Sequence, residues 1–296
     1  MFDGIAPVLA RFIDLAANAD YRQVDDCSVE IVESRMLINE EIANAKLMGI
    51  DARNVRTGIN MTSYVFTSQG KTYRLFLPGR PHQGEREHDL AKLRTSEDPL
   101  IRHSDAACKS ECLKPFPPRN AKGFTHSKDD GKRPVFPLEA NTIQANCLQH
   151  LLDTLKKAAP GFQREMRPMI HALRQVFAND TAAVGMEPLE RLAFHQEKSL
   201  PIMEELRKIA ERELRENKKA EPNCDYHRAL RYMLNHWPGL TEFLRTPGIP
   251  LTTSLVELAN KFTKQHLYTS LTFQTEHGAT VGAFFMSLIA TAWVLM

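Results

Sequence analysis

Apolar and polar positions follow two different periods along the first third of the chain. Apolar residues repeat with helical spacing near the N-terminus, and the segments that follow alternate with the period of two that is typical of strands. A glutamine and a glycine separate two such segments, which predicts a hairpin. In chain order the pattern predicts a helix, a strand, a helical or irregular stretch, a hairpin, a short helix and a short strand, over residues 5–17, 23–34, 36–48, 60–79, 84–93 and 99–105.

The rest of the chain is mainly helical by pattern. Residues 114–142 are rich in proline, glycine and charge, and we expect them to form a surface loop. Residues 164–244 have helical periodicity, with breaks near Pro188, Pro201 and Pro222. The composition of this stretch therefore predicts a set of consecutive helices in the middle of the chain.

The first predicted strand carries two adjacent aspartates on opposite faces. Its period of two places Asp25 with Cys27, Val29 and Ile31, whereas Asp26 lies on the more polar face. A carboxylate among apolar side chains is costly unless a metal ion, a cation or hydrogen bonds compensate it. Asp25 is therefore the better candidate for a site, and the alternative is that both aspartates are solvated at a frayed strand start.

A third carboxylate of interest, Glu257, lies in a predicted amphipathic helix near the C-terminus. Helical spacing places Leu255, Leu258, Ala259 and Phe262 in one apolar stripe. Glu257 is then on the opposite, polar face of the helix, where it can face a site.

The same sequence also has a purely structural interpretation. Thr252, Thr253 or Ser254 can cap the helix by accepting its first free N–H groups. Ser254 and Glu257 have the spacing of a capping box, in which the glutamate accepts a hydrogen bond from the N–H of the cap residue. Local sequence alone favours this capping role over a role in a site.

Composition indicates a globular protein with one large domain or two small ones. The chain has 296 residues, of which 43% are hydrophobic and 25% are charged. Its 38 basic and 36 acidic residues give a net charge of +2, so any contact with DNA has to use local patches. The five cysteines lack the spacing of a disulfide framework and the N-terminus lacks a secretory signal, which predicts a reducing, cytoplasmic compartment.

Two further features each have two interpretations. Residues 279–296 carry no charge and are nearly long enough to cross a membrane, but interrupting glycine, serine and threonine residues favour a buried helix over a tail anchor. Cys108, Cys112, Cys147 and His150 could bind zinc, but their spacing is poor for that purpose. Buried thiols are the favoured interpretation.

Three segments in the second half of the chain are its most distinctive motifs. They are MEPLERLAFHQEKSLPIMEEL, the stretch HWPGLTEFLRTPGIPLTTSLVELANK around Glu257, and TEHGATVGAFFMSLIAT. These segments resemble the insertion sequence 66 family of bacterial transposases, whose patterns include ERLxFHQxxSxP, FLxxPGxPL and VGxxFMSLI. The resemblance extends from about Ala6 to Thr291.

The resemblance implies three site residues. Members of the family hold metal ions with an Asp-Asp-Glu triad, so the proposed metal ligands and catalytic residues of this chain are Asp25, Asp105 and Glu257. Asp25 matches the family's strand motif that begins with two aspartates, and Asp105 matches the aspartate of its CDALS motif. Glu257 matches the glutamate of the C-terminal motif.

The resemblance also implies a fold. We expect an α/β fold of the ribonuclease H-like type, with a mixed sheet and a large helical insertion between the second aspartate and the glutamate. Residues 1–160 would form the first part of the catalytic core, residues 161–245 the helical insertion, and residues 246–296 the C-terminal catalytic helices.

The implied activity is metal-dependent cleavage and transfer of DNA strands in DNA transposition. Carboxylate oxygens suit Mg²⁺ or Mn²⁺, and two such ions activate the attacking group and stabilise the leaving oxygen. The implied partners are DNA at the transposon ends, accessory transposition proteins and further copies of the chain, without a membrane. Full-length members of the family also carry an N-terminal DNA-binding region, so we expect this chain to be a truncated catalytic core.

Two stretches differ from the family pattern. The family's Asp-Asn-Asn before the glutamate is replaced by Thr252-Thr253-Ser254, and its basic RKN is replaced by Leu267-Tyr268-Thr269. The carboxylates are retained while their polar and basic surroundings are lost. The sequence therefore leaves two hypotheses open: a transposase core, truncated and either active or inactive, and a non-catalytic DNA-binding or assembly remnant of a transposase.

Overall fold

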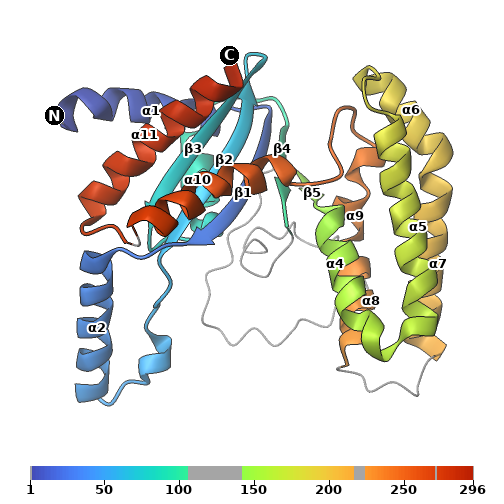
Figure 1. The fold of residues 1–296 in the computed structure, drawn as a ribbon, viewed down its shortest axis with the longest axis horizontal. Coiled ribbons are helices and arrows are strands. Elements are labelled where there is room, and N and C mark those ends of the chain that lie inside the picture. The colour runs from blue at the N-terminus through green and yellow to red at the C-terminus, as the bar shows by residue number, and fades with distance from the viewer. Residues whose placement is uncertain (1, 106–141, 217–223, 271, 296) are drawn as a thin grey trace. The chain divides into compact units, whose positions relative to one another are not determined.

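The structure is a computed structural model that divides into two compact units (Figure 1). It describes residues 2–105, 142–216, 224–270 and 272–295. Among these, the sheet unit contains residues 2–102, 142 and 254–295, and the helical unit contains residues 103–105 and 143–253. The predicted loop at 114–142 lies outside the described residues, except for Thr142.

Five strands form one mixed sheet in the order β3-β2-β1-β4-β5. The strands are β1 (Tyr21–Ser28), β2 (Asn60–Ser68), β3 (Lys71–Gly79), β4 (Leu100–Ser104) and β5 (Thr142–Asn146). The first three pair antiparallel, with Asp25 opposite Ser63. β1 therefore lies between the hairpin and β4, and the α/β class expected from the sequence is confirmed.

The hairpin of β2 and β3 has the predicted turn. Ser68 pairs with Lys71, and the two residues between them have positive φ values of 52° for Gln69 and 71° for Gly70. This combination is typical of the tight hairpin turns whose twist matches that of the strands.

The first strand is shorter than predicted. β1 ends at Ser28, and Ile31 forms an isolated parallel bridge with Phe273. The backbone N–H of Val32 then donates to the carbonyl of Phe273 at 2.9 Å, and a helix begins at the same residue. The prediction of a strand to residue 34 was wrong because the chain leaves the sheet to pair with a C-terminal segment.

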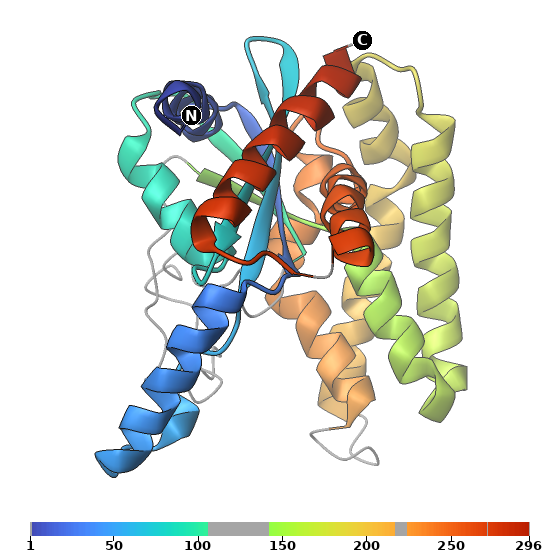
Figure 2. The ribbon, with the colours of Figure 1, turned by 60° about the vertical axis from the view of Figure 1, so that its left-hand side comes forward.

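Helices cover both faces of the hairpin strands (Figure 2). The helices of the sheet unit are α1 (Phe2–Ala17), α2 (Val32–Leu47), α3 (Gln83–Leu93), α10 (Ser254–Ser270) and α11 (Glu276–Leu295), with a short 3-10 turn η1 (Ala52–Asn54). Val24, Tyr64 and Leu75 point into a core with α1, whereas Met61 and Phe76 point into a second core with α10 and α11. The strands thus alternate between two buried faces, as their sequence period requires.

The last helix covers the free edge of the sheet. β3 ends the strand order, so its outward N–H groups have no neighbouring strand. The N–H of Phe76 donates to Ser287 Oγ at 3.0 Å, and the N–H of Arg74 donates to Thr291 Oγ1 at 2.9 Å. Among the described residues, α11 is the one helix long and apolar enough to cross a membrane. Its inner face packs on the sheet through these contacts, whereas Phe285, Ile289 and Trp293 are exposed, so the helix is buried on one side only.

The helical unit has the predicted run of helices. They are α4 (Leu148–Ala158), α5 (Gln163–Ala182), α6 (Pro188–Lys198), α7 (Leu200–Glu216), α8 (Asp225–Asn235) and α9 (Trp237–Leu240), with 3-10 turns η2 (Ala159–Gly161) and η3 (Glu242–Leu244). The breaks predicted near Pro188 and Pro201 are present, and the break predicted near Pro222 lies outside the described residues.

The compact helical unit also contains α4, and the domain bounds expected from the sequence stay a prediction. The compact unit already includes residues 143–160, because α4 packs on α5 and α8. Its apolar stripe, which includes Leu151 and Leu155, is fully buried. At the other end the unit extends to Thr253.

We predict that Ser287→Ala lowers the free energy of unfolding by about 1–3 kcal/mol, because it leaves the buried N–H of Phe76 without an acceptor. Thr280→Ala is the matched control, since the Thr280 hydroxyl donates only to the carbonyl of Glu276 within its own helix. Urea denaturation measures both variants. Equal effects of the two substitutions would contradict a special role of α11 at the sheet edge.

Candidate metal centre

Two hydrogen bonds fix the start of α10 on β1. The N–H of Val256 donates to Gln23 Oε1 at 3.1 Å, and Asn260 Nδ2 donates to Asp25 Oδ2 at 2.7 Å. Gln23 and Asp25 are two residues apart and therefore point to the same face of the sheet. The helix that carries Glu257 is thereby held against the strand that carries Asp25, within one compact unit.

The buried face of α10 agrees with the predicted stripe only at Ala259, which is buried, and at Phe262, which is partly buried against the core. The residues that point inward are spaced by three or four positions: Val256, Ala259, Asn260 and Thr263. Leu255 and Leu258 are 45% and 44% exposed, so their assignment to an apolar stripe was wrong. The helix is rotated because its polar Asn260 reaches the half-buried carboxylate of Asp25 and donates a hydrogen bond to it. Glu257 is exposed, as expected.

Asp25 is an oriented, half-buried carboxylate. Its Oδ2 accepts from Asn260, and its Oδ1 accepts from the N–H of Asp26 at 2.8 Å. Asp26 faces the other way and accepts from the hydroxyl of Thr62 at 2.7 Å and from the N–H of Gln83 at 2.9 Å. The alternative of two solvated aspartates is therefore wrong, and the opposite orientation of the pair is confirmed.

Asn260 was not recognised in the sequence as a candidate. Its side chain is only 4% exposed, and its Oδ1 is buried without a hydrogen-bond partner among the described residues. A buried amide oxygen without a partner is destabilising unless water or an ion satisfies it. The signal in the sequence was its position, because Asn260 follows Glu257 by three residues and so lies one turn away on the same side of the helix.

These groups fit a hard divalent cation. The two oxygens of Asp25 are both hard acceptors held in place by hydrogen bonds, and the Oδ1 atom of Asn260 adds a neutral oxygen. Oxygen ligands suit Mg²⁺ or Mn²⁺. Burial raises the pKa of the Cys27 thiol, Lys264 opposes this, and the net effect is a raised pKa, so the neighbouring sulfur stays a neutral thiol at pH 7.

Asp105 lies in the helical unit. It follows β4 directly, as predicted, and is half-buried. Its backbone carbonyl accepts a hydrogen bond from the hydroxyl of Tyr232 at 2.9 Å, which ties the end of β4 to α8. The meeting of Asp105 with Asp25 and Glu257 stays a prediction.

Cys147 is a buried thiol at the start of α4. The N–H of Thr253 donates to its Sγ at 3.4 Å. Burial raises the pKa of this thiol, but hydrogen bonds with His150 and Thr253 outweigh burial and lower the pKa. Cys147 is fully buried, as the interpretation as a buried thiol expects, and Cys108 and Cys112 lie outside the described residues.

The helix of Glu257 begins at Ser254, so Thr253 is the residue before its first turn. Thr253 is buried, and its N–H is used by Cys147. The capping box of Ser254 and Glu257 stays a prediction.

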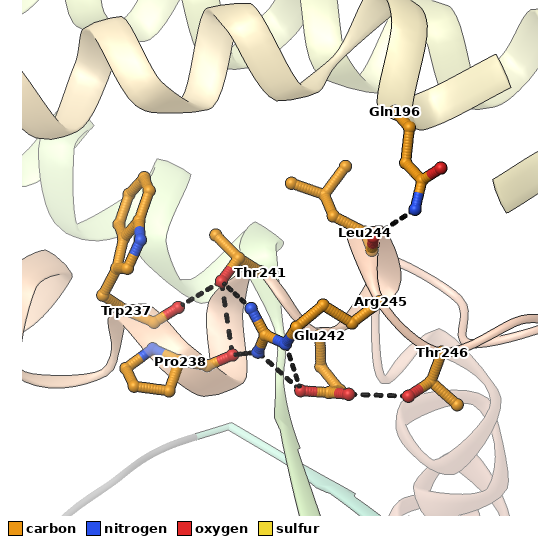
Figure 3. A network of polar contacts seen from close by, with 8 residues as sticks. All are labelled: Gln196, Trp237, Pro238, Thr241, Glu242, Leu244, Arg245 and Thr246. Atoms are coloured by element: carbon orange, nitrogen blue, oxygen red, sulfur yellow. Dashed lines mark hydrogen bonds and ion pairs between the residues drawn. The ribbon is translucent and has the colours of Figure 1, made fainter. Parts of the chain in front are cut away.

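The segment before α10 is held by its own polar network (Figure 3). Arg245 donates to Glu242 Oε2 at 2.5 Å and to Thr241 Oγ1 at 2.9 Å, and Thr246 donates to Glu242 Oε1 at 2.6 Å. Gln196 on α6 donates to the carbonyl of Leu244 at 3.1 Å. The turn between α8 and α10 is therefore fixed within the helical unit.

A second buried network includes three residues of the segment MEPLERLAFHQEKSLPIMEEL, namely Arg191, His195 and Ser199. His195 is 1% exposed, and its Nε2 lies 3.1 Å from Asp180 Oδ1 while its Nδ1 lies 2.9 Å from Ser199 Oγ. Arg191 also contacts Asp180. Serine, histidine and aspartate together can form a nucleophilic centre, but Ser199 is fully buried. These residues therefore hold α5, α6 and the start of α7 together.

The comparison with protein families matches this chain to one family of mobile-element enzymes. The model described as "Transposase IS66 family" matches residues 130–281, just over half of the chain. The chain therefore belongs to the IS66 family of transposases. The match includes Glu257 and begins after Asp25 and Asp105. Neither a curated protein nor a solved structure matches the chain.

Asp180 gives the helical unit a predictable acid sensitivity. Burial raises its pKa, but hydrogen bonds from His195 and Arg191 outweigh burial and lower the pKa below the ordinary value of 3.8. A carboxyl group with a depressed pKa in the folded state stabilises the fold fully above its unfolded pKa, and this contribution is lost as pH falls through the folded value.

We therefore predict that Asp180→Asn lowers the free energy of unfolding at pH 7 by about 1–3 kcal/mol and makes its decline below pH 3.8 shallower than in the parent protein. Denaturation curves between pH 3 and 7 measure this. Asp89→Asn is the control, because Asp89 is an exposed partner of Lys92. An unchanged acid decline in Asp180→Asn would contradict the assignment.

Proposed function

We propose that this chain is the catalytic core of a DDE-type transposase, which cleaves and transfers DNA strands with Mg²⁺ or Mn²⁺ held by Asp25, Asp105 and Glu257. The observation that carries the proposal is the hydrogen bond of 2.7 Å between Asn260 and Asp25. It joins the strand of the first carboxylate to the helix of the third, although 235 residues separate its two partners. Membership of the IS66 family supports the same assignment.

The strand order supports a ribonuclease H-like fold for this core. Three antiparallel strands come first, and β1 lies between β2 and β4. Asp25 is on β1, and Asp105 follows β4, so the two aspartates come from neighbouring strands. The helical unit is the insertion between Asp105 and Glu257.

In this proposal Asn260 and Glu257 have different roles beside the bound divalent ions. Bound divalent ions would activate the attacking hydroxyl or water and stabilise the leaving oxygen at a phosphodiester. Asn260 orients the carboxylate of Asp25 and contributes a neutral oxygen beside it. Glu257 is exposed on the neighbouring turn of α10, where DNA can reach it. The partner is DNA at transposon ends, which implies a cytoplasmic protein that acts with further copies of itself and accessory proteins.

A second candidate function is a non-catalytic DNA-binding or assembly remnant of a transposase. The observation that favours it is Thr253, which replaces an amide of the family motif and is buried with its N–H on Cys147. Thr253 therefore contributes to packing in the helical unit rather than to a polar site. The two candidates differ in one property, which is cleavage.

We predict that the protein nicks DNA carrying transposon ends in the presence of Mn²⁺, and that Asp25→Asn, Asp105→Asn and Glu257→Gln each lower the rate by at least about 100-fold, because each removes a metal ligand. Asp26→Asn is the matched control, since the oxygens of Asp26 accept from Thr62 and Gln83 on the other face of the sheet. Product formation is followed by gel electrophoresis. DNA binding without any cleavage by the parent protein would favour the remnant instead.

We further predict that Asn260→Ala weakens Mn²⁺ binding by about 10- to 100-fold, as expected when a residue that orients a metal ligand is lost. The shift of the melting temperature with Mn²⁺ concentration measures the affinity without requiring turnover. Thr263→Ala is the control, because Thr263 is buried on the same face of α10, one turn further from Asp25. The same Mn²⁺ midpoint in both variants would exclude this role of Asn260.

A further inference from the structure

One face of α5 in the helical unit is strongly cationic. Arg164, Arg167, His171 and Arg174 are all exposed. They recur at intervals of three and four residues, so they lie in one stripe along the helix. At 100° per residue the four positions fall within an arc of roughly 80°.

The stripe lies opposite the buried side of the helix. Met166, Met169, Leu173 and Val176 are each at most 1% exposed and form the inner face of α5. At helical spacing the centres of the two faces are roughly 160° apart. The cationic side chains therefore point away from the packed helices and are free to meet a partner.

Most other arginines of the described helical unit form ion pairs, and these four residues do not. Arg191, Arg207, Arg228 and Arg245 pair with Asp180, Glu211, Asp225 and Glu242. Within the described part of the chain, none of Arg164, Arg167, His171 and Arg174 forms an ion pair. The positive charge of the three arginines is therefore uncompensated, in a chain whose net charge is only +2.

The stripe also lines an open groove. The groove runs from the end of α4 over η2 to α5, and it is lined by the four stripe residues together with Lys156, Pro160 and Pro168. None of the described residues that line the groove is acidic. Lys156 has Asp153 as a partner at 3.0 Å, so the arginines supply the unpaired charge.

We propose that this cationic face of α5 binds the phosphate backbone of duplex DNA. The inference rests on the proposed function for the identity of the nucleic acid and goes beyond it in naming a surface. Guanidinium groups bind phosphate oxygens with two parallel hydrogen bonds. From Arg164 to Arg174 the stripe is about 15 Å long, enough for a run of neighbouring phosphates on one strand.

An anionic membrane does not fit this surface. A helix that lies in a membrane interface inserts an apolar face beside its basic face. The apolar face of α5 is buried in the helical unit, and Gln163, Pro168 and Gln175 flank the stripe instead.

The test is the salt dependence of DNA affinity, measured by fluorescence anisotropy on the full chain with a labelled duplex and EDTA. The slope of the logarithm of the association constant against the logarithm of the salt concentration is negative. The triple variant Arg164→Gln, Arg167→Gln, Arg174→Gln should make it shallower by about 2–3, since each lost phosphate contact reduces its magnitude by about 0.9. The matched control is Arg212→Gln, Arg215→Gln, Arg228→Gln, which removes the same charge from exposed positions on α7 and α8 and should leave the slope unchanged. A triple lysine variant of the α5 residues should keep most of the slope.

The proposal would be overturned if the salt dependence of DNA affinity became equally shallow in both glutamine variants, or if it stayed unchanged in the α5 variant. Binding to vesicles of anionic lipid but not to DNA would also overturn it. Unchanged melting temperatures confirm that the variants are folded. Because EDTA removes divalent ions, binding is measured without cleavage, so a chain that never cleaves DNA can still show the α5 effect. Failure of this proposal is thereby separated from failure of the proposed function.

Discussion

The contact between β1 and α10 is the constraint on which the architecture of the sheet unit depends. Gln23 and Asp25 accept hydrogen bonds from residues 233 and 235 positions later in the chain. The sheet unit is thus built from both ends of the sequence, with the helical unit inserted between them. Such an insertion is tolerated because the entropy of loop closure grows only slowly with loop length. The helix that carries Glu257 reaches Asp25 because the chain returns to the sheet unit after the helical unit.

A buried cluster of charges supports the same strand from its other face. Glu87 on α3 contacts Arg22 on β1 at 2.7 Å and Arg102 on β4 at 3.1 Å, and all three side chains are at most 3% exposed. Removing one partner from such a cluster would leave a buried charge uncompensated. β1 is therefore fixed between α3 on one side and α10 on the other, which keeps Asp25 in one orientation.

Strong periodicity made the strands, the hairpin and most helices predictable, because burial on one face leaves a clear pattern in residue order. The pattern failed at α10, where polar Asn260 and Thr263 point inward and Leu255 and Leu258 point outward. Hydrophobic spacing does not reveal a buried amide that serves a carboxylate on a distant strand. For the same reason the sequence identified Asp25 and Glu257 as candidates and missed Asn260, which joins Asp25 to the helix that carries Glu257. The resemblance to the family identified the helical insertion, but its buried network of Asp180 and His195 became visible only in three dimensions.

The central claim is that Asp25, Asp105 and Glu257 hold divalent metal ions together. Crystals of the chain soaked in Mn²⁺ test it most directly, through anomalous scattering. We expect anomalous peaks bound by oxygens of all three carboxylates, with Asn260 beside Asp25. Absence of such peaks, with Glu257 folded back onto the N–H of Ser254 as a helix cap, would contradict it and leave a protein with the fold of a transposase core but without its metal centre.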